Sequence, residues 1–519
     1  MKHICLAFLV ISFTGAWASS KTIYYNIEDF GAVGDGKTIN TVAINRAIDE
    51  AAKHGGGTVF FPAGQFVSFT IHLKSNISLY LDQGAVLIGG TPENGIGYDA
   101  HDPKPPYHMY QDFGHTNWRN SLIWGEGLQN ISILGQGLIW GKGLRSHSKY
   151  TDPKGSGVKA IALKLCRNVN IRDISILHGG HLAISTTGVD NLTIDNVKAD
   201  CDRGAFDIDC CKNVKVSNCT VSSPDDGICL KSSFGLGYAR ATENVAITNC
   251  QMSNYDEGTL LDGTLGKTFR DDQPDAEWCI TGRLKLGTES NGGFKNIVVS
   301  NCVFDRSRGF VIETVDGGDL EDIAITNITM RDITDLPFFI RLGARMRNPD
   351  SLPIGKCRRI ILSNIVAYNV GHDMKDNRFR LCGMIMGIPG HYVEDVELSN
   401  IKIYFAGGGT REMVDLDVPE NEKTYPDPYR WKTMPAYGLY IRHAKNIKVH
   451  NVDIRYENQE YRPAFVLDDV EGATFRQIDA QKATDAPYFM LRNVKDFTLN
   501  QAKGMKDVVF ENANNEMIR

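Results

Sequence analysis

A short pattern that recurs along most of the chain constrains the fold more than any other feature. Each copy reads polar–apolar–x–apolar–x–Asn/Asp–apolar–x–apolar, as in NVNIRDISI from Asn168, NLTIDNVKA from Asn191 and NVKVSNCTV from Asn213. The apolar residues alternate as in a β-strand, skip one position at the Asn or Asp, and then alternate again. Two short strands joined at a tight bend explain this pattern, because Asn tolerates a left-handed backbone.

The spacing of the copies predicts a solenoid. The first three copies begin at residues 168, 191 and 213, and later copies, from Asn244 to Asn446, are the same unit with loops inserted. The apolar edge of one unit is covered only by its neighbour, so a repeat of about 22 residues without helical periodicity predicts a β-solenoid. Leucine-rich repeats share this period, but their leucines and helical half-repeats are missing. The predicted fold is all-β, a right-handed parallel β-helix.

The first 18 residues have the features of a secretory signal peptide. Lys2 and His3 precede an apolar stretch, and Ala16-Trp17-Ala18 matches a small-residue cleavage site. No later apolar run approaches the ~20 residues of a membrane-spanning helix. A net charge of −6 gives no basic face for nucleic acid. We expect an exported protein, periplasmic or secreted, that is a monomer with no membrane span and no nucleic-acid partner.

The mature chain is predicted to be one domain over residues 24–519. A cap at about 24–65 contains a helix over TVAINRAIDEAAKH, and the coils follow at about 66–510, with inserted loops at about 91–120, 254–282 and 405–436. GAVGDGKT, before the predicted helix, fits the pattern of a phosphate-binding loop. Alternating β and α elements do not follow it, so the helix is interpreted as a cap over the open end of the solenoid.

The cysteines predict neither a disulfide framework nor a metal site. Eleven remain after removal of the signal peptide, an odd number, and several occupy one position of the repeat, as in Cys219, Cys250 and Cys302. Such placement indicates small apolar residues that face inward. The adjacent pair Cys210-Cys211 lacks metal-ligand spacing. We therefore predict no metal and no cofactor.

Two segments carry a resemblance to known proteins. IEDFGAVGDGKT, continuing to VFFPAG, resembles the N-terminal segment of the pectin-lyase-like β-helix proteins. NVKVSNCTVSSPDDGICLKSS and NGGFKNIVVSNCVFDRSRGFVIET resemble glycoside hydrolase family 28, the polygalacturonase family. The likeness runs from about Ile27 to past Asn451. It implies an inverting glycosidase that acts on a plant cell-wall polysaccharide or oligosaccharide derived from pectin.

Paired carboxylates suit that chemistry. Inverting glycosidases need a carboxylic acid and a carboxylate ~6.5–9.5 Å apart. Coils of a β-helix stack ~4.8 Å apart, so neighbouring coils can supply them. Crowded carboxylates also have pKa values that move apart. We predict that Asp225 and Asp226, in SSPDDG, are the acid and the water-activating base; without the resemblance, these residues would be interpreted as a turn.

The chain departs from the family pattern at three places. The position of the family's third catalytic carboxylate is Gly204, so Asp202 or Asp207 is predicted to replace it. The family histidine has no counterpart, because no His occurs from Asn254 to Ser290. The Arg-Ile-Lys triplet that holds a galacturonate carboxylate is replaced by Val311-Ile312-Glu313, which favours a diverged specificity.

Charged residues near the pair are the predicted substrate contacts. The family's histidine position falls at Asp256 when counted from Asn249-Cys250, and near Thr281 or Gly282 when counted back from LGTES. Glu289 lies about one coil before Glu313. The two glutamates are predicted to bind hydroxyls of a neutral sugar, to supply the missing base, or to pair with nearby cations. Trp278 and the aromatic residues of the late loop are candidates for stacking on sugar rings. The predicted substrate-binding set is Lys231, Asp256, Glu257, Lys285, Glu289, Glu313 and Arg341.

Three functions remain open from the sequence. The first is a glycosidase of diverged specificity, with exo action on rhamnogalacturonan or a pectin side chain. The second is a polysaccharide lyase on the same fold, for which no basic residue is an obvious base. The third is a glycan-binding β-helix without catalysis.

Overall fold

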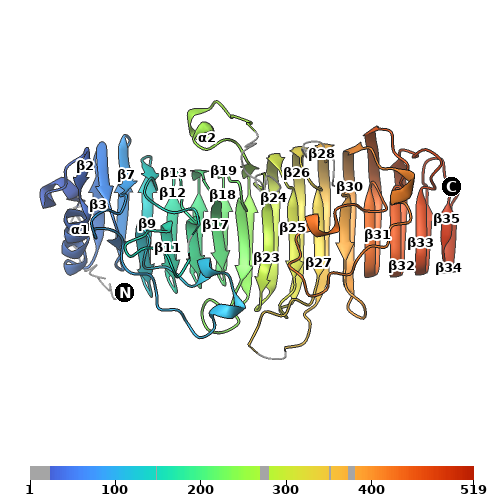
Figure 1. Cartoon of the computed structure of the whole chain (residues 1–519), viewed down its shortest axis with the longest axis horizontal. Coiled ribbons are helices and arrows are strands. Elements are labelled where there is room, and N and C mark those ends of the chain that lie inside the picture. Colours follow the sequence, from blue (N-terminus) through green and yellow to red (C-terminus); the bar gives the residue numbers. More distant parts are fainter. Residues whose placement is uncertain (1–23, 148, 269–279, 350–351, 372–379) are drawn as a thin grey trace, which may run out of the picture.

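The computed structural model describes residues 24–147, 149–268, 280–349, 352–371 and 380–519. The predicted signal peptide and Trp278 lie outside this part of the chain. The fold is a parallel β-helix, as predicted from the repeat: successive coils stack along one axis from the N-terminal cap to the C-terminal end (Figure 1). Among the described residues, no helix is long and apolar enough to cross a membrane.

Each coil contributes strands to three parallel stacks, here called sheets I, II and III. Sheet I contains β5 (Ile71–His72), β8 (Ile123–Glu126), β11 (Lys159–Lys164), β14 (Leu182–Thr187), β17 (Gly204–Asp209), β20 (Ile228–Ser232), β23 (Leu284–Ser290), β25 (Phe310–Thr314), β27 (Phe338–Leu342) and β29 (Gly383–Met386). Sheet II contains β1 (Tyr24–Asn26), β3 (Gly57–Phe61), β6 (Ile77–Leu81), β9 (Gln129–Gly135), β12 (Arg167–Arg172), β15 (Asp190–Asp195), β18 (Lys212–Ser217) and β21 (Thr242–Thr248). Sheet III contains β2 (Asp35–Ile39), β4 (Gly64–Ser68), β7 (Ala85–Gly89), β10 (Leu138–Trp140), β13 (Ser175–Leu177), β16 (Lys198–Asp200), β19 (Thr220–Ser222) and β22 (Gln251–Ser253).

Later coils join their strands into long ones that bend through more than one sheet. These are β24 (Phe294–Ser307), β26 (Leu320–Ile333), β28 (Cys357–Val370), β30 (Val393–Gly407), β31 (Leu439–Asn458), β32 (Phe465–Ala480) and β33 (Phe489–Asn500).

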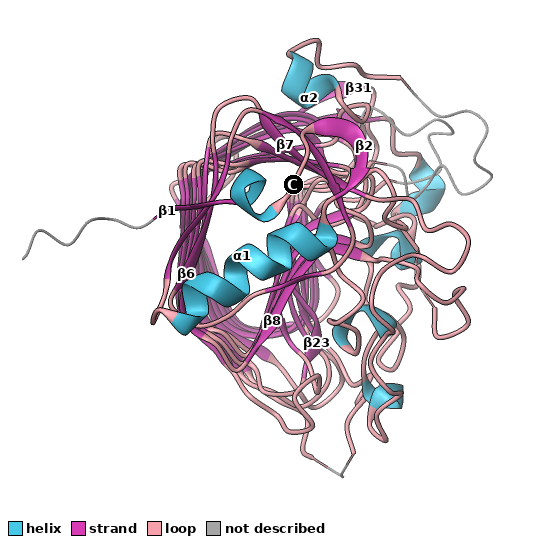
Figure 2. Cartoon of the chain, turned by 90° about the vertical axis from the view of Figure 1, so that its left-hand side faces the viewer, coloured by secondary structure: helices cyan, strands magenta, loops and turns pink. Residues whose placement is uncertain are grey.

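Both ends of the solenoid are covered. The predicted helix is present as α1 (Thr41–Lys53) and lies across the N-terminal end, where Figure 2 shows it over the opening. Ile44, Ala47 and Ile48 on its inner face are fully buried against the core. At the other end, β34 (Val508–Ala513) and β35 (Glu516–Ile518) pair antiparallel with β33. The short helix α2 (Thr259–Asp262) belongs to an inserted loop.

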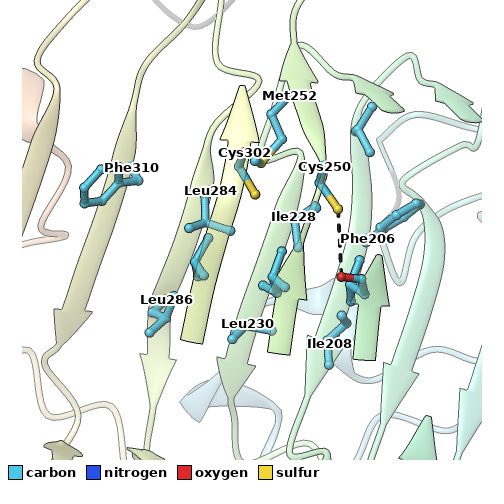
Figure 3. Close-up of a cluster of buried hydrophobic side chains, with 14 of the residues drawn as sticks. Phe206, Ile208, Ile228, Leu230, Cys250, Met252, Leu284, Leu286, Cys302 and Phe310 are labelled. Atoms are coloured by element: carbon cyan, nitrogen blue, oxygen red, sulfur yellow. Dashed lines mark hydrogen bonds between the residues drawn. The ribbon is translucent and has the colours of Figure 1, made fainter. Parts of the chain in front are cut away.

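The core consists of inward side chains stacked from coil to coil. Figure 3 shows such columns: Phe206, Ile228 and Leu284 occupy one register position in three successive strands of sheet I, and Ile208, Leu230 and Leu286 the next. All six are buried. Cys250 and Cys302 lie in the same core as unpaired thiols, which agrees with the prediction that repeat-position cysteines face inward.

Asparagine ladders hold the bends. The Asn at the sixth repeat position is left-handed, as predicted, with φ values of 57° at Asn218 and 55° at Asn249. The Asn that opens each repeat is left-handed too, which the sequence interpretation did not foresee. Asn213 (φ 57°) donates from Nδ2 to Oδ1 of Asn191 at 3.2 Å and accepts from Nδ2 of Asn244 at 3.1 Å. Each coil therefore has two bends that are bonded to the coils on either side.

Replacing Asn213 should separate the two contributions of a ladder residue. Asn213→Gly keeps the left-handed conformation and loses the side-chain hydrogen bonds, whereas Asn213→Ala also pays about 1–2 kcal/mol for left-handed Ala. We expect the midpoint of urea unfolding to fall in the order wild type, Gly variant, Ala variant. Equal midpoints for the Gly and Ala variants would contradict a role for backbone strain at this bend.

Candidate active site

The candidate site lies on the outer face of sheet I, where four successive strands place charged residues side by side. Asp207 on β17 shares a register position with Lys285 on β23, and Lys231 on β20 and Glu313 on β25 lie two residues further along their strands, on the same face. Neighbouring strands are about 4.8 Å apart, so outward side chains of adjacent coils are within reach of ionic contact. The arrangement turns residues distant in sequence into one row.

Asp226 is the best-defined carboxylate of the site. It follows the turn before β20 and is 13% exposed. Arg283 donates from Nε to its Oδ1 at 2.6 Å, and Lys285 Nζ lies 3.7 Å from Oδ2. Burial alone would raise the pKa of Asp226, but Arg283, Lys285 and Lys231 together lower it well below the usual value of an aspartate. Asp226 is therefore an ionised carboxylate at neutral pH.

Asp225, the other member of the pair, is the accessible one. Its side chain is 43% exposed and lies 3.3 Å from Nε of Arg203. Its own Oδ1 accepts a hydrogen bond from the Asp226 backbone N–H at 2.8 Å. Ser223 Oγ stabilises the turn by donating to the Arg203 carbonyl at 2.7 Å. The two carboxylates thus share a turn but differ in environment, one held between cations and one open to solvent.

Asp207 lies beneath the pair in a buried cluster. It is 2% exposed, 3.5 Å from Nδ1 of His115 and 3.9 Å from Nζ of Lys231. Burial, with the charges of Glu289 and Asp226, raises the pKa of Asp207 to about 7, against the opposing effect of Lys231 and Lys159. Its Oδ1 is buried and makes no hydrogen bond within the described residues. Asp207 can therefore carry a proton near neutral pH.

Lys231 and Lys285 each bridge two carboxylates. Lys231 donates to Glu289 at 2.8 Å, while Lys285 donates to the hydroxyl of Tyr425 at 3.0 Å and lies 3.6 Å from Glu313. Glu289 and Glu313 are essentially unexposed. The cations near Glu289 lower its pKa well below the usual value despite burial, whereas burial raises the pKa of Glu313. Of the alternatives predicted for these glutamates, the structure places both in ion pairs.

Asp202, Asp256 and Glu257 lie in a different cluster. Asp202 accepts from the Gly180 backbone N–H at 3.0 Å and lies 3.4 Å from Nε2 of His178. Nδ1 of the same imidazole is 2.8 Å from Glu257. Asp256 accepts from the Thr268 backbone N–H at 3.0 Å and 3.1 Å, through its two oxygens. The His178–Glu257 contact joins the α2 loop to the solenoid, whereas the Asp256 contact lies within the loop. The structure does not bring the three carboxylates into the row around Asp226.

Arg341 on β27 is in register with Glu313 and anchors the late loop over this part of sheet I. It is fully buried and donates from Nη1 to the Gly387 carbonyl at 2.8 Å and from Nη2 to the Glu420 carbonyl at 2.7 Å. Its guanidinium lies 5.2 Å from the centre of the Trp431 ring. The late loop that it holds covers sheet I beyond the charged row, and apolar side chains fill the space beneath the loop: Val311, Phe339, Met384, Met386, Val418, Trp431, Tyr440 and Val466 among them.

A second loop covers the other side of the row. His115, Thr116 and Asn117 are buried over β11, where Lys159 donates to the Gly114 carbonyl at 2.7 Å. His115 is also 3.7 Å from Asp209. Burial lowers its pKa, so this histidine is a neutral neighbour of Asp207 at neutral pH. The charged row is therefore bounded by chain on both sides along the solenoid axis.

Several functional candidates were missed from the sequence. His115 and Asp427 come from the two long loops, which carry no repeat register. Tyr425, also from the late loop, was among the aromatic candidates for sugar stacking, and the structure places its hydroxyl on Lys285. Asp427 lies 3.3 Å from Nη2 of Arg283, so that arginine is held between Asp226 and Asp427. Arg283 lies in the alternating segment TGRLKLGTES. Its spacing of two residues from Lys285 was the sequence signal that both side chains point to the same face.

A side chain at Gly204, where the family pattern would place a carboxylate, would require Leu182 to shift. A Cβ at this position would lie 2.8 Å from a methyl carbon of Leu182 and 4.0 Å from the Asp226 carbonyl oxygen. The third carboxylate near Asp226 is instead Asp207, three residues further along the same strand.

Comparison with known proteins agrees with this fold and with the family resemblance. The N-terminal residues 24–97 match the model for rhamnogalacturonase A/epimerase, pectate lyase-like, and residues 108–256, which include Asp207, Asp225 and Asp226, match glycosyl hydrolases family 28. A probable polygalacturonase from Vitis vinifera is 24% identical over 443 residues, or 80% of this chain and 81% of that protein.

Two further relatives complete the comparison. An exo-poly-alpha-D-galacturonosidase from Dickeya chrysanthemi is 34% identical over 134 residues, 25% of this chain and 21% of that protein. The solved structure of a Yersinia enterocolitica family 28 exopolygalacturonase has the same fold, with a TM-score of 0.62, 18% identity, and coverage of 88% of this chain and 79% of that chain.

The fold and the site together define a parallel β-helix glycosidase. Within that class the chain is polygalacturonase-like and related to glycoside hydrolase family 28, which confirms the resemblance noted in its sequence.

The raised pKa of Asp207 predicts a pH-dependent stability. Because the native state binds this proton up to about pH 7 and the unfolded state only up to about 4, stability falls as pH rises between these values. Asp207→Asn should therefore gain stability relative to wild type from pH 4 to 7, by at most about 4 kcal/mol at 1.4 kcal/mol per pKa unit, and no more above pH 7.

Thermal unfolding of both proteins from pH 4 to 8 measures this difference. Asp173→Asn, at an exposed ladder position that already tolerates Asn, is the matched control and should show no such trend. A constant difference between wild type and the Asp207 variant across the range would show that Asp207 is ionised throughout.

Proposed function

We propose that this protein is an inverting, exo-acting glycosidase of pectin-derived oligosaccharides, with a specificity that differs from that of ordinary polygalacturonases. The observation that carries the proposal is the Asp225–Asp226 turn: one carboxylate is fixed in its ionised form and the other is open to solvent, at the centre of a charged row closed on both sides by loops.

Asp226 is the proposed general base. A water-activating carboxylate must be ionised, and Arg283 and Lys285 keep it so. The same contacts hold the side chain in one orientation, which a base needs because the attacking water has to be aimed at the anomeric carbon. Its partial exposure leaves room for that water and the sugar.

Asp225 is the proposed general acid. It is the neighbouring carboxylate with enough exposure to reach a glycosidic oxygen. Arg203 contacts it at 3.3 Å and would orient it toward the leaving group. Asp207, being buried, is assigned a positioning role: its titration near pH 7 changes the charge beside Lys231 and hence the field around Asp226.

Exo action follows from the shape of the site. An endo-acting enzyme needs a groove that a polymer can cross, whereas here the late loop fills one side with apolar side chains and the loop around His115 covers the other. The Dickeya chrysanthemi relative, which is named as an exo-poly-alpha-D-galacturonosidase, supports this direction of attack.

The substrate is proposed to be a pectin-derived glycan in which a neutral sugar occupies the position nearest Glu313. The buried cations of the row are engaged with protein carboxylates or Tyr425, so they are not available for a uronate. Rhamnogalacturonan and pectin side chains offer such a neutral residue. The Vitis vinifera relative is named as a probable polygalacturonase, which supports pectin as the source of the substrate.

Substitution of the pair tests catalysis. Asp225→Asn and Asp226→Asn should each lower the rate about 10²- to 10⁴-fold on the best substrate of a panel of pectin-derived oligosaccharides, as expected for loss of a general acid or base. Chromatography gives the products, and Asp173→Asn is the control of equal chemistry outside the site. Activity retained in both variants would remove these roles, and products with unsaturated ends would indicate a lyase.

The time course on long polymer tests exo action. We expect saturated mono- or disaccharide to be released from the start while the viscosity of the polymer solution falls slowly, because each cut removes only a chain end. Tyr425→Ala, which removes the loop's contact with Lys285, should shift the products toward longer fragments. Rapid loss of viscosity with the wild-type enzyme would mean that the site admits internal segments.

A further inference from the structure

The outer face of sheet II carries a continuous row of exposed side chains. Figure 2 shows this sheet edge-on, labelled at β6, on one side of the molecule, while most described loops gather on the opposite side. A groove of about 800 Å³ follows the face from β18 to β31. Its outward row, one residue per coil, is Lys215, Ala246, Val298, Ala324, Ile361, Glu397 and Lys448.

The centre of this row is aliphatic. Val298 and Ile361 are 39% and 46% exposed although they lie in the middle of a sheet face, and alanines flank them. Adjacent exposed aliphatic groups are costly to hydrate and are typical of an interface. The residues that line the groove include no aromatic side chain, which disfavours a sugar as the occupant.

We propose that a second copy of this chain docks on the face, with the two solenoid axes antiparallel. The two-fold axis would run along the strand direction, between the coils of Val298 and Ala324. In such an isologous contact each residue meets the second copy's residue at the reflected coil. Three pairs result on each side of the axis: Val298 faces Ala324, Ala246 faces Ile361, and Lys215 faces Glu397.

Each of these pairs is complementary. The larger Ile361 meets the small Ala246, and Val298 meets the small Ala324, so protruding side chains enter the lower parts of the opposite groove. Lys215 meets a carboxylate. Lys215 is exposed and forms no ion pair with another described residue, while Glu397 has only His450, at 3.8 Å. Both charges are therefore available to a second copy.

The charged residues along one margin of the face are complementary about the same axis. Along successive coils it alternates in charge, with Lys212, Glu243, Lys295, Glu321, Arg358 and Glu394. The same axis places Lys212 opposite Glu394, Glu243 opposite Arg358, and Lys295 opposite Glu321. The contact would cover roughly 30 by 20 Å, or about 600 Å² per copy, near the ~800 Å² per partner of a standard stable interface.

This assembly replaces the monomer expected from the sequence and does not rest on the proposed function. The charged row of sheet I faces away from sheet II and stays accessible in the dimer.

Sedimentation of the full mature protein at micromolar concentrations and moderate salt tests the proposal. We expect a dimer, and a monomer for Ile361→Asp. Lys215→Glu and Glu397→Lys should each raise the dissociation constant at least about tenfold, because each places like charges opposite one another twice. The double variant should return to within about threefold of wild type, as a double-mutant cycle requires for a direct pair.

The double variant is decisive because Lys215 and Glu397 lie five coils apart in one chain, about 24 Å at the stacking distance, and interact only between copies. Lys198→Glu, exposed on β16 of sheet III, is the matched control and should leave the dimer unchanged. Equal thermal midpoints of the variants exclude misfolding. A monomeric wild type, a dimer insensitive to Ile361→Asp, or single reversals without rescue would each overturn this interface.

Discussion

The parallel hydrogen bonding between coils is the constraint on which every other feature of this molecule depends. It holds neighbouring strands about 4.8 Å apart and in register. The residues one coil away therefore determine which side chains lie beside any outward-facing charge. Asp226, Lys285 and Glu313 come from three coils and form one row for this reason. The same register aligns the asparagines of the bends and the side chains of the core.

A row of buried charges at this spacing is stable only when the signs alternate. Lys231 between Asp207 and Glu289, and Lys285 between Asp226 and Glu313, meet that requirement. Burying such ions carries a large desolvation cost, which the mutual attraction offsets when the geometry is good. The network therefore does more to set the protonation of these carboxylates than to stabilise the fold, since it lowers the pKa of Asp226 while the pKa of Asp207 is raised.

The fold was predictable because the sequence pattern that specifies it is local and recurs in successive coils. Alternation of apolar residues and the recurring Asn define strands and bends without knowledge of distant contacts, and the helix α1 followed from its amphipathic pattern. Asp225 and Asp226 could be proposed as a catalytic pair because their turn has a fixed place between strands of this register. The buried state of Glu289, Glu313 and Arg341 was not foreseen.

That burial depends on the two long loops, whose positions are set by tertiary contacts and not by any repeat. Tyr425 and Asp427 reach the row from the late loop, and His115 reaches it from the other side. A loop without periodicity gives no sequence signal for where it will dock. Asp202 is separated from Asp207 for a different reason: it precedes β17, whereas Asp207 lies within this extended strand.

The asparagine ladders have a consequence for how such a chain can change in length. Because side chains alternate along each strand, inserting a single residue between two ladder positions would exchange inside and outside for the rest of that strand and break the hydrogen bonds to both adjacent coils. Insertions at the corners leave the ladders intact. A parallel β-helix therefore lengthens by whole coils or by loops inserted at its corners. New binding specificities arise in those loops, while the stacked sheets stay the same.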